Sequence, residues 1–522
     1  MSTSSRTQRF IGGLSLGYLN TALVMAVALW LTPYLLRHLG EHEYGLWLLG
    51  AQVLVYLGLM DLGVVALLPR EVAYATGRAG DDRWHELPRL VGETAWLVLW
   101  QTPAVAIAGV LFWWLIPADW SALRWPLALV ISTFVVAFPL RIFQAVLQGL
   151  QDLPFLGSIQ LVAWIVGTAA TVGCVAAGFG LYGLSAGWVT TQLISAGLTW
   201  RRLVRRFPDV LPHGLPSLSL LAVRAQIGRG VWISVSQVAQ VLLNGTDLFV
   251  IGRLLGPAAV VPYACTGKLV TLLANQPQLF MQMAVPALSE LRAGVARERL
   301  FQVSTAMSQV MLIVSGAITC VVLAVNQPFV TWWVGAGQFG GRGLTALLLI
   351  AMLLRHWNLT AGYTLFCFGR ERRLAITGIA DGLVTLGAML VLVPPFGVSG
   401  AVLGSLIGAC GVSLPNNLRA LAREEGVSLF ASITPLRPWF VRFAVVAAAV
   451  TMASSMWTPY GLWRFAWSAA LVGCLYVVVM LPILLMPPLG SLLSARLEPW
   501  ITSLSNILRR GKPAETVISG ST

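Results

Sequence analysis

Three apolar stretches of the sequence each contain a cation that could bind a phosphate or carboxylate. Arg355 lies near the middle of one stretch with His356 beside it, and Arg141 and Lys268 lie in two others. A guanidinium stays charged and forms paired hydrogen bonds to phosphate or carboxylate, whereas an ammonium acts as a point charge. These residues predict a cationic site for an anionic ligand. The alternatives are a structural pairing of Arg355, for example with Asp381, and snorkelling of Arg141 to a membrane surface.

Two of the apolar stretches carry stripes of polar side chains at helical spacing. The stripes comprise Gln237, Gln240, Asn244 and Asp247, and then Lys268, Thr271, Asn275, Gln278 and Gln282. Residues three or four positions apart lie on one face of a helix. Two neighbouring helices with continuous polar faces predict a water-filled cavity between them. A purely structural hydrogen-bond seam is the alternative.

Acidic and histidine side chains within the apolar stretches are candidates for coupling or gating. Asp247 and Lys268 are expected at similar depth, so they could form an ion pair that opens when an anion arrives. Titration of an aspartate or histidine could couple movement of a ligand to protons. The candidate coupling or gating residues are Asp247, Asp61, Asp381 and His356.

The residue patterns of several other chemistries are absent from the sequence. There is no G-x-x-x-x-G-K-[ST] phosphate loop, and the only lysines are Lys268 and Lys512. The six cysteines are widely spaced, and no His/Cys or His/carboxylate cluster suggests a metal site. We therefore expect no enzyme activity, no catalytic residues, no cofactor and no metal. A membrane-embedded glycosyltransferase or ligase is the alternative from a different class, but acids in the predicted outer loops are few.

The composition explains which elements must position these residues. The chain has 522 residues, of which 57% are hydrophobic and only 10% charged, whereas soluble proteins have about 25% charged residues. Apolar runs of about 20 residues recur, as transmembrane helices require. We predict an all-α polytopic membrane protein with about fourteen transmembrane helices. The predicted spans are 11–36, 44–69, 91–116, 125–149, 158–179, 182–200, 230–255, 260–285, 305–330, 343–366, 374–395, 398–418, 438–458 and 462–487.

The distribution of basic residues predicts the orientation of these helices. The chain has 34 Lys and Arg residues against 20 Asp and Glu, and most of the cations fall in loops on one side. The positive-inside rule places those loops, and both termini, in the cytoplasm. The cations on the predicted outer side are Arg37, Arg124, Arg253, Arg342 and Arg464. The same bias accounts for the net charge of +14, so we expect no nucleic-acid partner.

An internal repeat divides the predicted helices into two halves. Phe179-Gly180-x-x-Gly183-x-x-x-Gly187 recurs 217 positions later from Phe396, and Arg37-x-Leu39-Gly40 recurs 216 positions later from Arg253. Two halves with six spans each predict two lobes in pseudo-twofold repeat, with two further helices. The predicted division is a lobe over 1–200, a basic cytoplasmic linker over 201–229, a second lobe over 230–418, two additional helices over 419–487 and a cytoplasmic tail over 488–522.

Several motifs resemble one transporter family in their residues and their order. They are LLRHLGEHEYGLW at 35–47, YLGLMDLG at 56–63, REVA at 70–73, DLFVIGRLLG at 247–256 with Tyr263, and the two glycine turns after Phe179 and Phe396. This order is similar to the polysaccharide-export family, the O-antigen flippase-like branch of the multidrug, oligosaccharidyl-lipid and polysaccharide (MOP) superfamily. The resemblance covers roughly residues 35–405.

The resemblance implies a MATE-like fold and a flippase that works by alternating access in the bacterial cytoplasmic (inner) membrane. It implies an undecaprenyl-diphosphate-linked oligosaccharide or polysaccharide repeat unit as substrate, membrane lipid around the protein, and polysaccharide polymerase and chain-length regulator proteins as partners. The expected cavity residues are Arg355, Lys268, Arg141, Asn275, Gln278, Gln240 and Asn244. A lipid II-type flippase and a drug or organic-cation antiporter of the same superfamily are the alternatives, and the cations argue against the antiporter.

Overall fold

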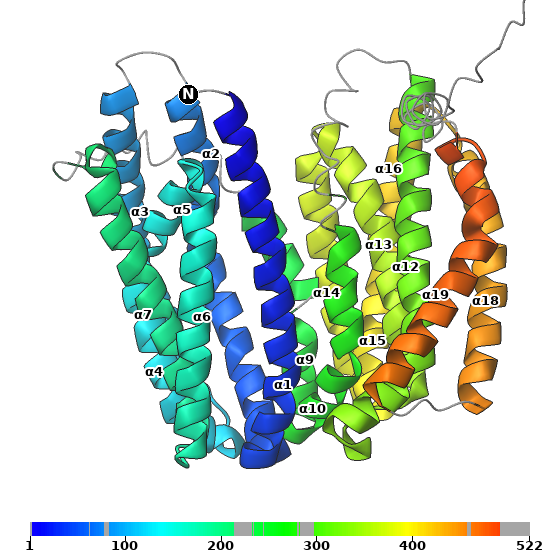
Figure 1. Cartoon of the computed structure of the whole chain (residues 1–522), viewed down its shortest axis with the longest axis horizontal. Helices are drawn as coiled ribbons and strands as arrows, with labels where there is room; N and C mark the ends of the chain where they lie inside the picture. Colours follow the sequence, from blue (N-terminus) through cyan, green and yellow to red (C-terminus); the bar gives the residue numbers. More distant parts are fainter. Residues whose placement is uncertain are drawn as a thin grey trace, which may run out of the picture. The chain divides into compact units, whose positions relative to one another are not determined.

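The computed structural model is helical throughout its described parts (Figure 1). It describes residues 3–61, 63–77, 83–212, 214, 232, 234–243, 245–278, 281, 297–456 and 461–490. The longer helices are α1 (Thr3–Gly58), α2 (Val64–Gly77), α3 (Arg83–Trp114), α4 (Ser121–Ala137), α5 (Arg141–Gly149), α6 (Leu153–Ala176), α7 (Leu181–Arg206), α9 (Thr246–Leu254), α10 (Pro257–Thr266), α12 (Arg297–Val334), α13 (Arg342–Cys367), α14 (Glu371–Phe396), α15 (Val398–Gly408), α16 (Leu414–Glu425), α18 (Arg437–Met456) and α19 (Leu462–Leu485). The short elements are η1 (Leu59–Asp61), η2 (Ala118–Trp120), η3 (Pro208–Val210), η4 (Ala336–Gln338), the π-helix η5 (Ala409–Ser413), α17 (Leu429–Ile433) and η6 (Thr434–Leu436).

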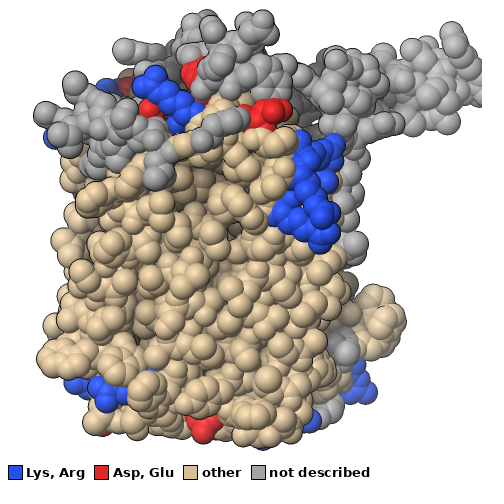
Figure 2. Space-filling view, turned by 90° about the vertical axis from the view of Figure 1, so that its left-hand side faces the viewer, with Lys and Arg blue, Asp and Glu red and all other residues tan. Residues whose placement is uncertain are grey.

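Most of these helices have the length and apolar character of membrane spans. Within the described residues, ten are long and apolar enough to cross a bilayer, or eleven if the bent pair Pro257–Thr266 and Lys268–Gln278 is one span. On the face shown in Figure 2, charged side chains lie toward the two ends and a band without them lies between. The prediction of an all-helical polytopic membrane protein is confirmed, and the count of fourteen helices stays a prediction.

The contacts divide the chain into two units, which we describe separately. Unit 1 comprises Met1–Lys268, Phe329–Ala351 and Glu371–Ser413, and unit 2 comprises Leu269–Pro328, Met352–Arg370 and Leu414–Thr522. Helices α12 and α13 each contribute one segment to either unit. The predicted lobes over 1–200 and 230–418 are a separate, sequence-based division and stay a prediction.

The repeated motifs of unit 1 have the same backbone conformation in both copies. Gly40 and Gly256, which end the two R-x-L-G motifs, have φ/ψ of 77°/173° and 91°/160°. Gly180 and Gly397, in the two F-G turns, have 54°/−130° and 59°/−145°. Residues with a Cβ rarely adopt these positive φ values, so glycine is required at each turn. After those turns, α7 packs along α6 and α15 packs along α14 (Figure 1).

Two of the predicted continuous spans are broken in the structure. The predicted span 44–69 ends as a helix at Gly58, continues as η1 to Asp61 and restarts at Val64 after Gly63, whose φ is +71°. The predicted span 125–149 is interrupted between Ala137 and Arg141, beside Pro139. Hydropathy alone shows no gap at either place, because the residues around both breaks are apolar.

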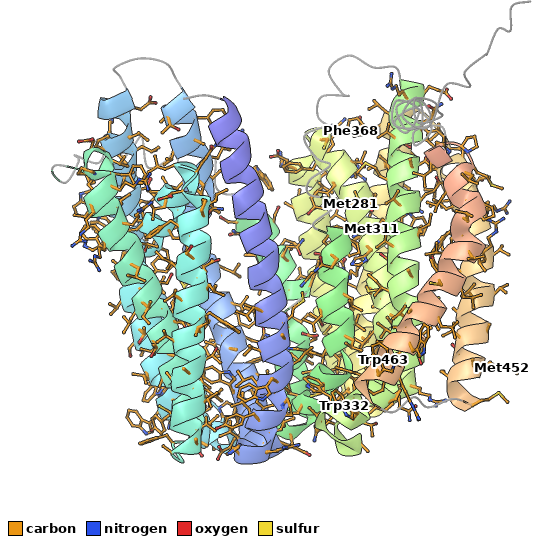
Figure 3. The ribbon with its side chains drawn as sticks, in the orientation of Figure 1. Met281, Met311, Trp332, Phe368, Met452 and Trp463 are labelled. Carbon is orange, nitrogen blue, oxygen red and sulfur yellow. The ribbon has the colours of Figure 1, made fainter. Side chains whose placement is uncertain are left out.

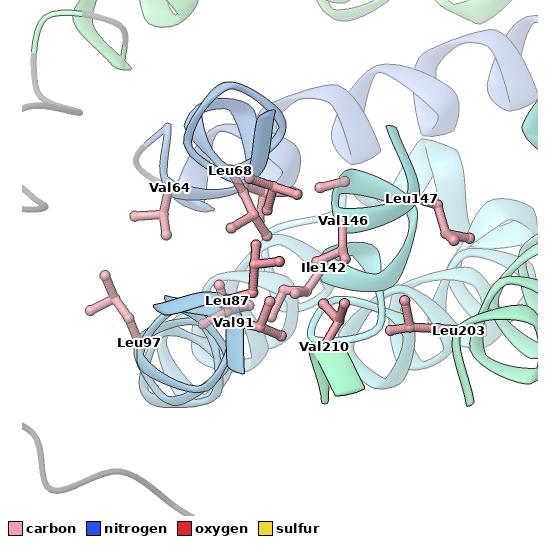
Figure 4. Close-up of a cluster of buried hydrophobic side chains, with 14 of the residues drawn as sticks. Val64, Leu68, Leu87, Val91, Leu97, Ile142, Val146, Leu147, Leu203 and Val210 are labelled. Carbon is pink, nitrogen blue, oxygen red and sulfur yellow. The ribbon is translucent and has the colours of Figure 1, made fainter. Parts of the chain in front are cut away.

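A compact apolar cluster holds these broken helices together. Most of its members come from α2, α3 and α5, and others from α6, α7 and η3. They include Leu68, Val91, Ile142, Val146 and Val210, all nearly inaccessible (Figure 4). Gly149 allows α5 to approach α2 closely, because a Cβ there would clash with Val72 and with the carbonyl of Pro69. The cluster therefore fixes the start of α5 relative to the residues that precede α2.

In unit 2, the last two helices, α18 and α19, meet at α12. Trp439 of α18 donates its indole N–H to the hydroxyl of Tyr476 of α19 at 3.0 Å, and both side chains are fully buried. Gly316 of α12 provides the space for this pair, since a Cβ there would clash with Tyr476. On the other side of α18, Met452 projects outward and is 69% exposed (Figure 3). The outward faces of these helices are thus apolar, as expected of lipid-facing surfaces.

Candidate functional site

Asp61 and Arg141 form an ion pair at the two helix breaks of unit 1. The guanidinium Nη2 of Arg141 lies 3.5 Å from Oδ2 of Asp61. The Asp61 side chain is 4% exposed and that of Arg141 is 38% exposed. The distance is long for a charge-assisted hydrogen bond, which is usually about 2.7–2.9 Å. The pair is therefore loose and accessible from its arginine side.

Local structure holds the Asp61 carboxylate more firmly than it holds the guanidinium. Oδ1 of Asp61 accepts a hydrogen bond from the backbone N–H of Gly63 at 2.9 Å, within the turn that separates η1 from α2. Arg141 begins α5, and its guanidinium lies 5.6 Å from the ring centroid of Phe138. An aromatic face orients a guanidinium without satisfying its N–H donors.

Hydrogen-bonding capacity remains unfilled around this ion pair. Nη1 of Arg141 is buried and has no hydrogen-bond partner within the described structure, and the same is true of Oε1 of Gln101. The amide Nε2 of Gln101 donates to the backbone carbonyl of Asp61 at 3.4 Å. A buried donor or acceptor without a partner is unfavourable by about 1–3 kcal/mol. An incoming anion would satisfy the free donor of Arg141.

A second aspartate of unit 1 makes a different kind of contact. The hydroxyl of Tyr263 donates to Oδ2 of Asp247 at 2.7 Å, and the N–H of Leu248 donates to Oδ1 at 2.9 Å. Asp247 lies in the first turn of α9, where the helix dipole favours a negative charge. The ion pair that the sequence suggested between Asp247 and Lys268 is not formed: the phenol of α10 takes that place.

The chain just before Asp247 is tied to the first half of the sequence. The hydroxyl of Tyr56 in α1 lies 3.1 Å from the carbonyl of Gly245, to which it donates, and 3.4 Å from the hydroxyl of Thr246. A Cβ at Gly45 of α1 would clash with the carbonyl of Pro257, so α1 and α10 cross closely. These contacts position α9 and α10 against α1 in unit 1.

The predicted polar stripes are only partly described. In the first, Gln240 is exposed and Asn244 lies outside the described residues. In the second, Lys268 and Gln278 are half-buried and Asn275 is exposed, whereas Gln282 lies outside the described residues. The cavity that these stripes predict stays a prediction.

The remaining predicted residues lie in two further places. In α13, Nδ1 of His356 lies 2.7 Å from the hydroxyl oxygen of Ser315 of α12, in unit 2, and Arg355 beside it is half-buried. In α14 of unit 1, the fully buried Asp381 accepts a hydrogen bond from the hydroxyl of Thr385 at 3.0 Å. Asp381 packs near Gly408, directly before the π-helix η5, and π-helices often mark functional segments.

The structure brings together two residues that the sequence treated separately and adds partners that were missed. Asp61 and Arg141 were separate candidates, one for coupling and one for the cavity, and they meet at one site. Gln101 was overlooked, although a lone amide within the predicted span 91–116 was a usable signal. Tyr263 was noticed only as part of a repeated motif and is the partner of Asp247.

Comparisons with known proteins bear on the family and on the fold. Residues 119–337 match the family model described as polysaccharide biosynthesis protein. A comparison with curated protein sequences found no match. Among solved structures, the chain resembles an inward-facing multidrug resistance MATE family transporter of the MOP superfamily (TM-score 0.61, 13% identity), covering 80% of this chain and 99% of that one.

Two other solved structures have the same fold. One is the lipid II flippase MurJ in an inward closed conformation (TM-score 0.58, 10% identity), covering 88% of this chain and 99% of that one. The other is a MOP superfamily transporter from Pyrococcus furiosus, with a binding pocket of reverse polarity (TM-score 0.52, 14% identity), covering 80% and 94%. The resemblance seen in the sequence is confirmed: this multi-pass membrane protein has the MATE-like fold of the MOP superfamily transporters and, over residues 119–337, matches the polysaccharide biosynthesis protein family.

Proposed function

We propose that the protein is a flippase that moves an undecaprenyl-diphosphate-linked oligosaccharide or polysaccharide repeat unit across the cytoplasmic membrane by alternating access. The observation that carries this proposal is the loose Arg141–Asp61 pair, with a buried Arg141 donor that lacks a partner. The match of residues 119–337 to a polysaccharide biosynthesis family supports the class of cargo.

A diphosphate headgroup suits the chemistry around Arg141. Its oxygens accept paired hydrogen bonds from a guanidinium, and such charge-assisted bonds are roughly twice as strong as neutral ones. The buried Nη1 donor has no partner to give up when the guanidinium turns toward a phosphate. An organic cation would instead meet the guanidinium first and be repelled by it.

The ion pair also suggests how the site returns to its ligand-free state. When the headgroup arrives, Arg141 exchanges the 3.5 Å contact to Asp61 for shorter bonds to phosphate. After release, Asp61 takes the guanidinium back, because its own carboxylate stays anchored to the N–H of Gly63. The lipid tail remains in the bilayer during this exchange.

We extend the proposal to the other predicted cavity residues and to the topology. Arg355, Lys268 and the amides of the two polar stripes complete the path of the headgroup. Fourteen membrane helices place both termini in the cytoplasm of a bacterium, as the distribution of Lys and Arg favours. Polysaccharide polymerase and chain-length regulator proteins receive the exported unit.

Deletion of the gene in the source organism tests the proposed function. We expect exported polysaccharide to be lost and the lipid-linked sugar to accumulate on the cytoplasmic face of the membrane. Wild-type protein should restore export and Arg141→Ala should not, although the variant inserts at wild-type level. A parallel pair at the predicted cavity, Arg355→Ala and Arg355→Lys, should show loss and partial retention of export.

The same strains separate the alternatives. If the deletion stops synthesis of the lipid-linked sugar itself, the protein acts before export and the flippase proposal is wrong. If export continues and only sensitivity to cationic drugs changes, an antiporter replaces it.

A further inference from the structure

We infer that an apolar pocket at one end of unit 1 holds an acyl chain of an anionic phospholipid whose phosphate is bound by Arg253. The pocket has a volume of about 230 Å³ and lies between α1, the end of α3, the start of α4 and α9. Neither Arg141 nor Asp61 lines it, and no other predicted cavity residue does.

The walls of the pocket are almost entirely apolar. Phe249 of α9 lies edge-on to Phe112 of α3, with ring centroids 6.1 Å apart, and to Trp120 of η2 at 5.8 Å. Leu123 and Leu127 of α4 form another wall and are almost fully buried. Because a drug-sized site usually has about 300–1,000 Å³, this smaller volume suits one end of a hydrocarbon chain.

One cation stands among the lining residues that the structure describes. Arg253 lies in the last turn of α9 and its side chain is exposed, so its guanidinium can reach a ligand from the rim. An apolar cavity with a single arginine at its edge complements a molecule with a hydrocarbon tail and an anionic head. Guanidinium binds phosphate through paired hydrogen bonds.

The surroundings place this pocket at the level of lipid headgroups. Trp114 and Trp125 are 66% and 65% exposed, and the guanidinium of Arg124 lies 5.0 Å from the ring centroid of Trp113. Tryptophan and arginine at the ends of apolar helices are typical of the interface between a bilayer and water. A phospholipid of the adjacent leaflet can therefore present its phosphate to Arg253 without leaving its normal depth.

The internal repeat provides a matched control for the role of Arg253. Arg37 occupies the same position of the R-x-L-G motif in the first half, and the glycines that end both motifs have similar conformations. Arg37 is also exposed, but it does not line the pocket. A general attraction of exposed arginines to lipid would affect both residues equally, whereas a built site depends on Arg253 alone.

Lipid retention by the purified full-length protein tests this inference. The protein is incubated with phosphatidylglycerol, phosphatidylcholine or undecaprenyl phosphate, and bound lipid is counted by native mass spectrometry. We expect phosphatidylglycerol to be retained in preference to phosphatidylcholine, and any undecaprenyl phosphate to be retained independently of Arg253. Arg253→Gln should reduce that retention at least about threefold, the loss of one charge-assisted contact, and Arg37→Gln should leave it at the wild-type level. Leu115→Trp, which fills the pocket from its exposed rim, should reduce retention of phosphatidylglycerol as well.

Three results would overturn the inference. Equal loss in Arg253→Gln and Arg37→Gln would indicate nonspecific attraction to anionic lipid. Unchanged retention in both Arg253→Gln and Leu115→Trp would leave the pocket without a lipid. Preferential, Arg253-dependent retention of undecaprenyl phosphate would make the occupant the polyprenyl chain and not a phospholipid. Because these measurements are of lipid retention at a site apart from Arg141, each outcome leaves the flippase proposal to its own test.

Discussion

Two aspartates of unit 1 stand at helix breaks, and their partners differ. Asp61 faces a partly exposed arginine at 3.5 Å, and that arginine keeps a buried donor without a partner. Asp247 accepts a 2.7 Å hydrogen bond from the neutral phenol of Tyr263 and lies at the N-terminus of α9. The first arrangement can exchange its partner for an anion at low cost. The second is short and favoured by the helix dipole, so it fixes α9 to α10.

The largest expected effect comes from replacing Arg141, which can exchange its contact to Asp61 for one to a phosphate. Arg141→Ala should lower export per inserted molecule about tenfold or more, since losing one member of a partly desolvated charge pair is unfavourable by about 2–5 kcal/mol. Arg141→Lys should retain part of the activity, because lysine keeps the positive charge but lacks the paired N–H donors of a guanidinium. Export is measured against the amount of protein in the membrane fraction. Wild-type export by Arg141→Ala would remove this residue from the mechanism.

Breaking the hydrogen bond between Tyr263 and Asp247 should lower the stability of the protein and leave transport unchanged. Tyr263→Phe removes a hydrogen bond to a charged acceptor, which contributes about 1.5–3 kcal/mol. We expect a lower thermal unfolding temperature in detergent and unchanged export per folded molecule. A large loss of export at full stability would show that Asp247 and Tyr263 belong to the transport machinery, and the contrast with Asp61 would disappear.

Neutralising Asp61, which competes with a phosphate for Arg141, should have a smaller effect on lipid binding, in the opposite direction. Asp61→Asn keeps an oxygen for the N–H of Gly63 but removes the negative charge that Arg141 faces. Because the pair is long at 3.5 Å and open on its arginine side, it holds Arg141 weakly, and affinity for a diphosphate lipid should rise roughly two- to fivefold. The increase should shrink at high salt, because screening weakens the original pair. Weaker binding would mean that Asp61 supports the anion site directly.

The smallest effect is expected from replacing Tyr56, whose hydroxyl contacts the residues just before Asp247. Tyr56→Phe removes neutral hydrogen bonds to Gly245 and Thr246, and a neutral hydrogen bond contributes about 0.5–1.5 kcal/mol. Its unfolding temperature should fall less than that of Tyr263→Phe, and export should be unchanged. A larger fall would locate the main anchor of α9 at Tyr56.

The sequence predicted the glycine turns but not the helix breaks that form the site. Gly40, Gly256, Gly180 and Gly397 could be recognised because the motifs repeat at a nearly constant offset and only glycine suits those conformations. The interruption around Asp61 lies within apolar sequence, where hydropathy does not distinguish a straight helix from a broken one. Predicted spans such as 44–69 and 125–149 were therefore continuous.

The pairing of site residues was also beyond the sequence. Asp61 and Arg141 are far apart along the chain, and the packing of α5 on α2 brings them together. The sequence suggested an ion pair between Asp247 and Lys268 because both were expected at similar depth. Depth does not fix direction, however, and the phenol of Tyr263 reaches the carboxylate instead.

The most direct test of the central claim is binding of undecaprenyl diphosphate to purified wild-type, Arg141→Ala and Tyr263→Phe proteins, followed by native mass spectrometry. The account predicts that wild type and folded Tyr263→Phe retain the lipid equally, whereas Arg141→Ala loses it about tenfold or more. Equal retention by all three proteins would contradict the assignment of Arg141 as the phosphate-binding cation.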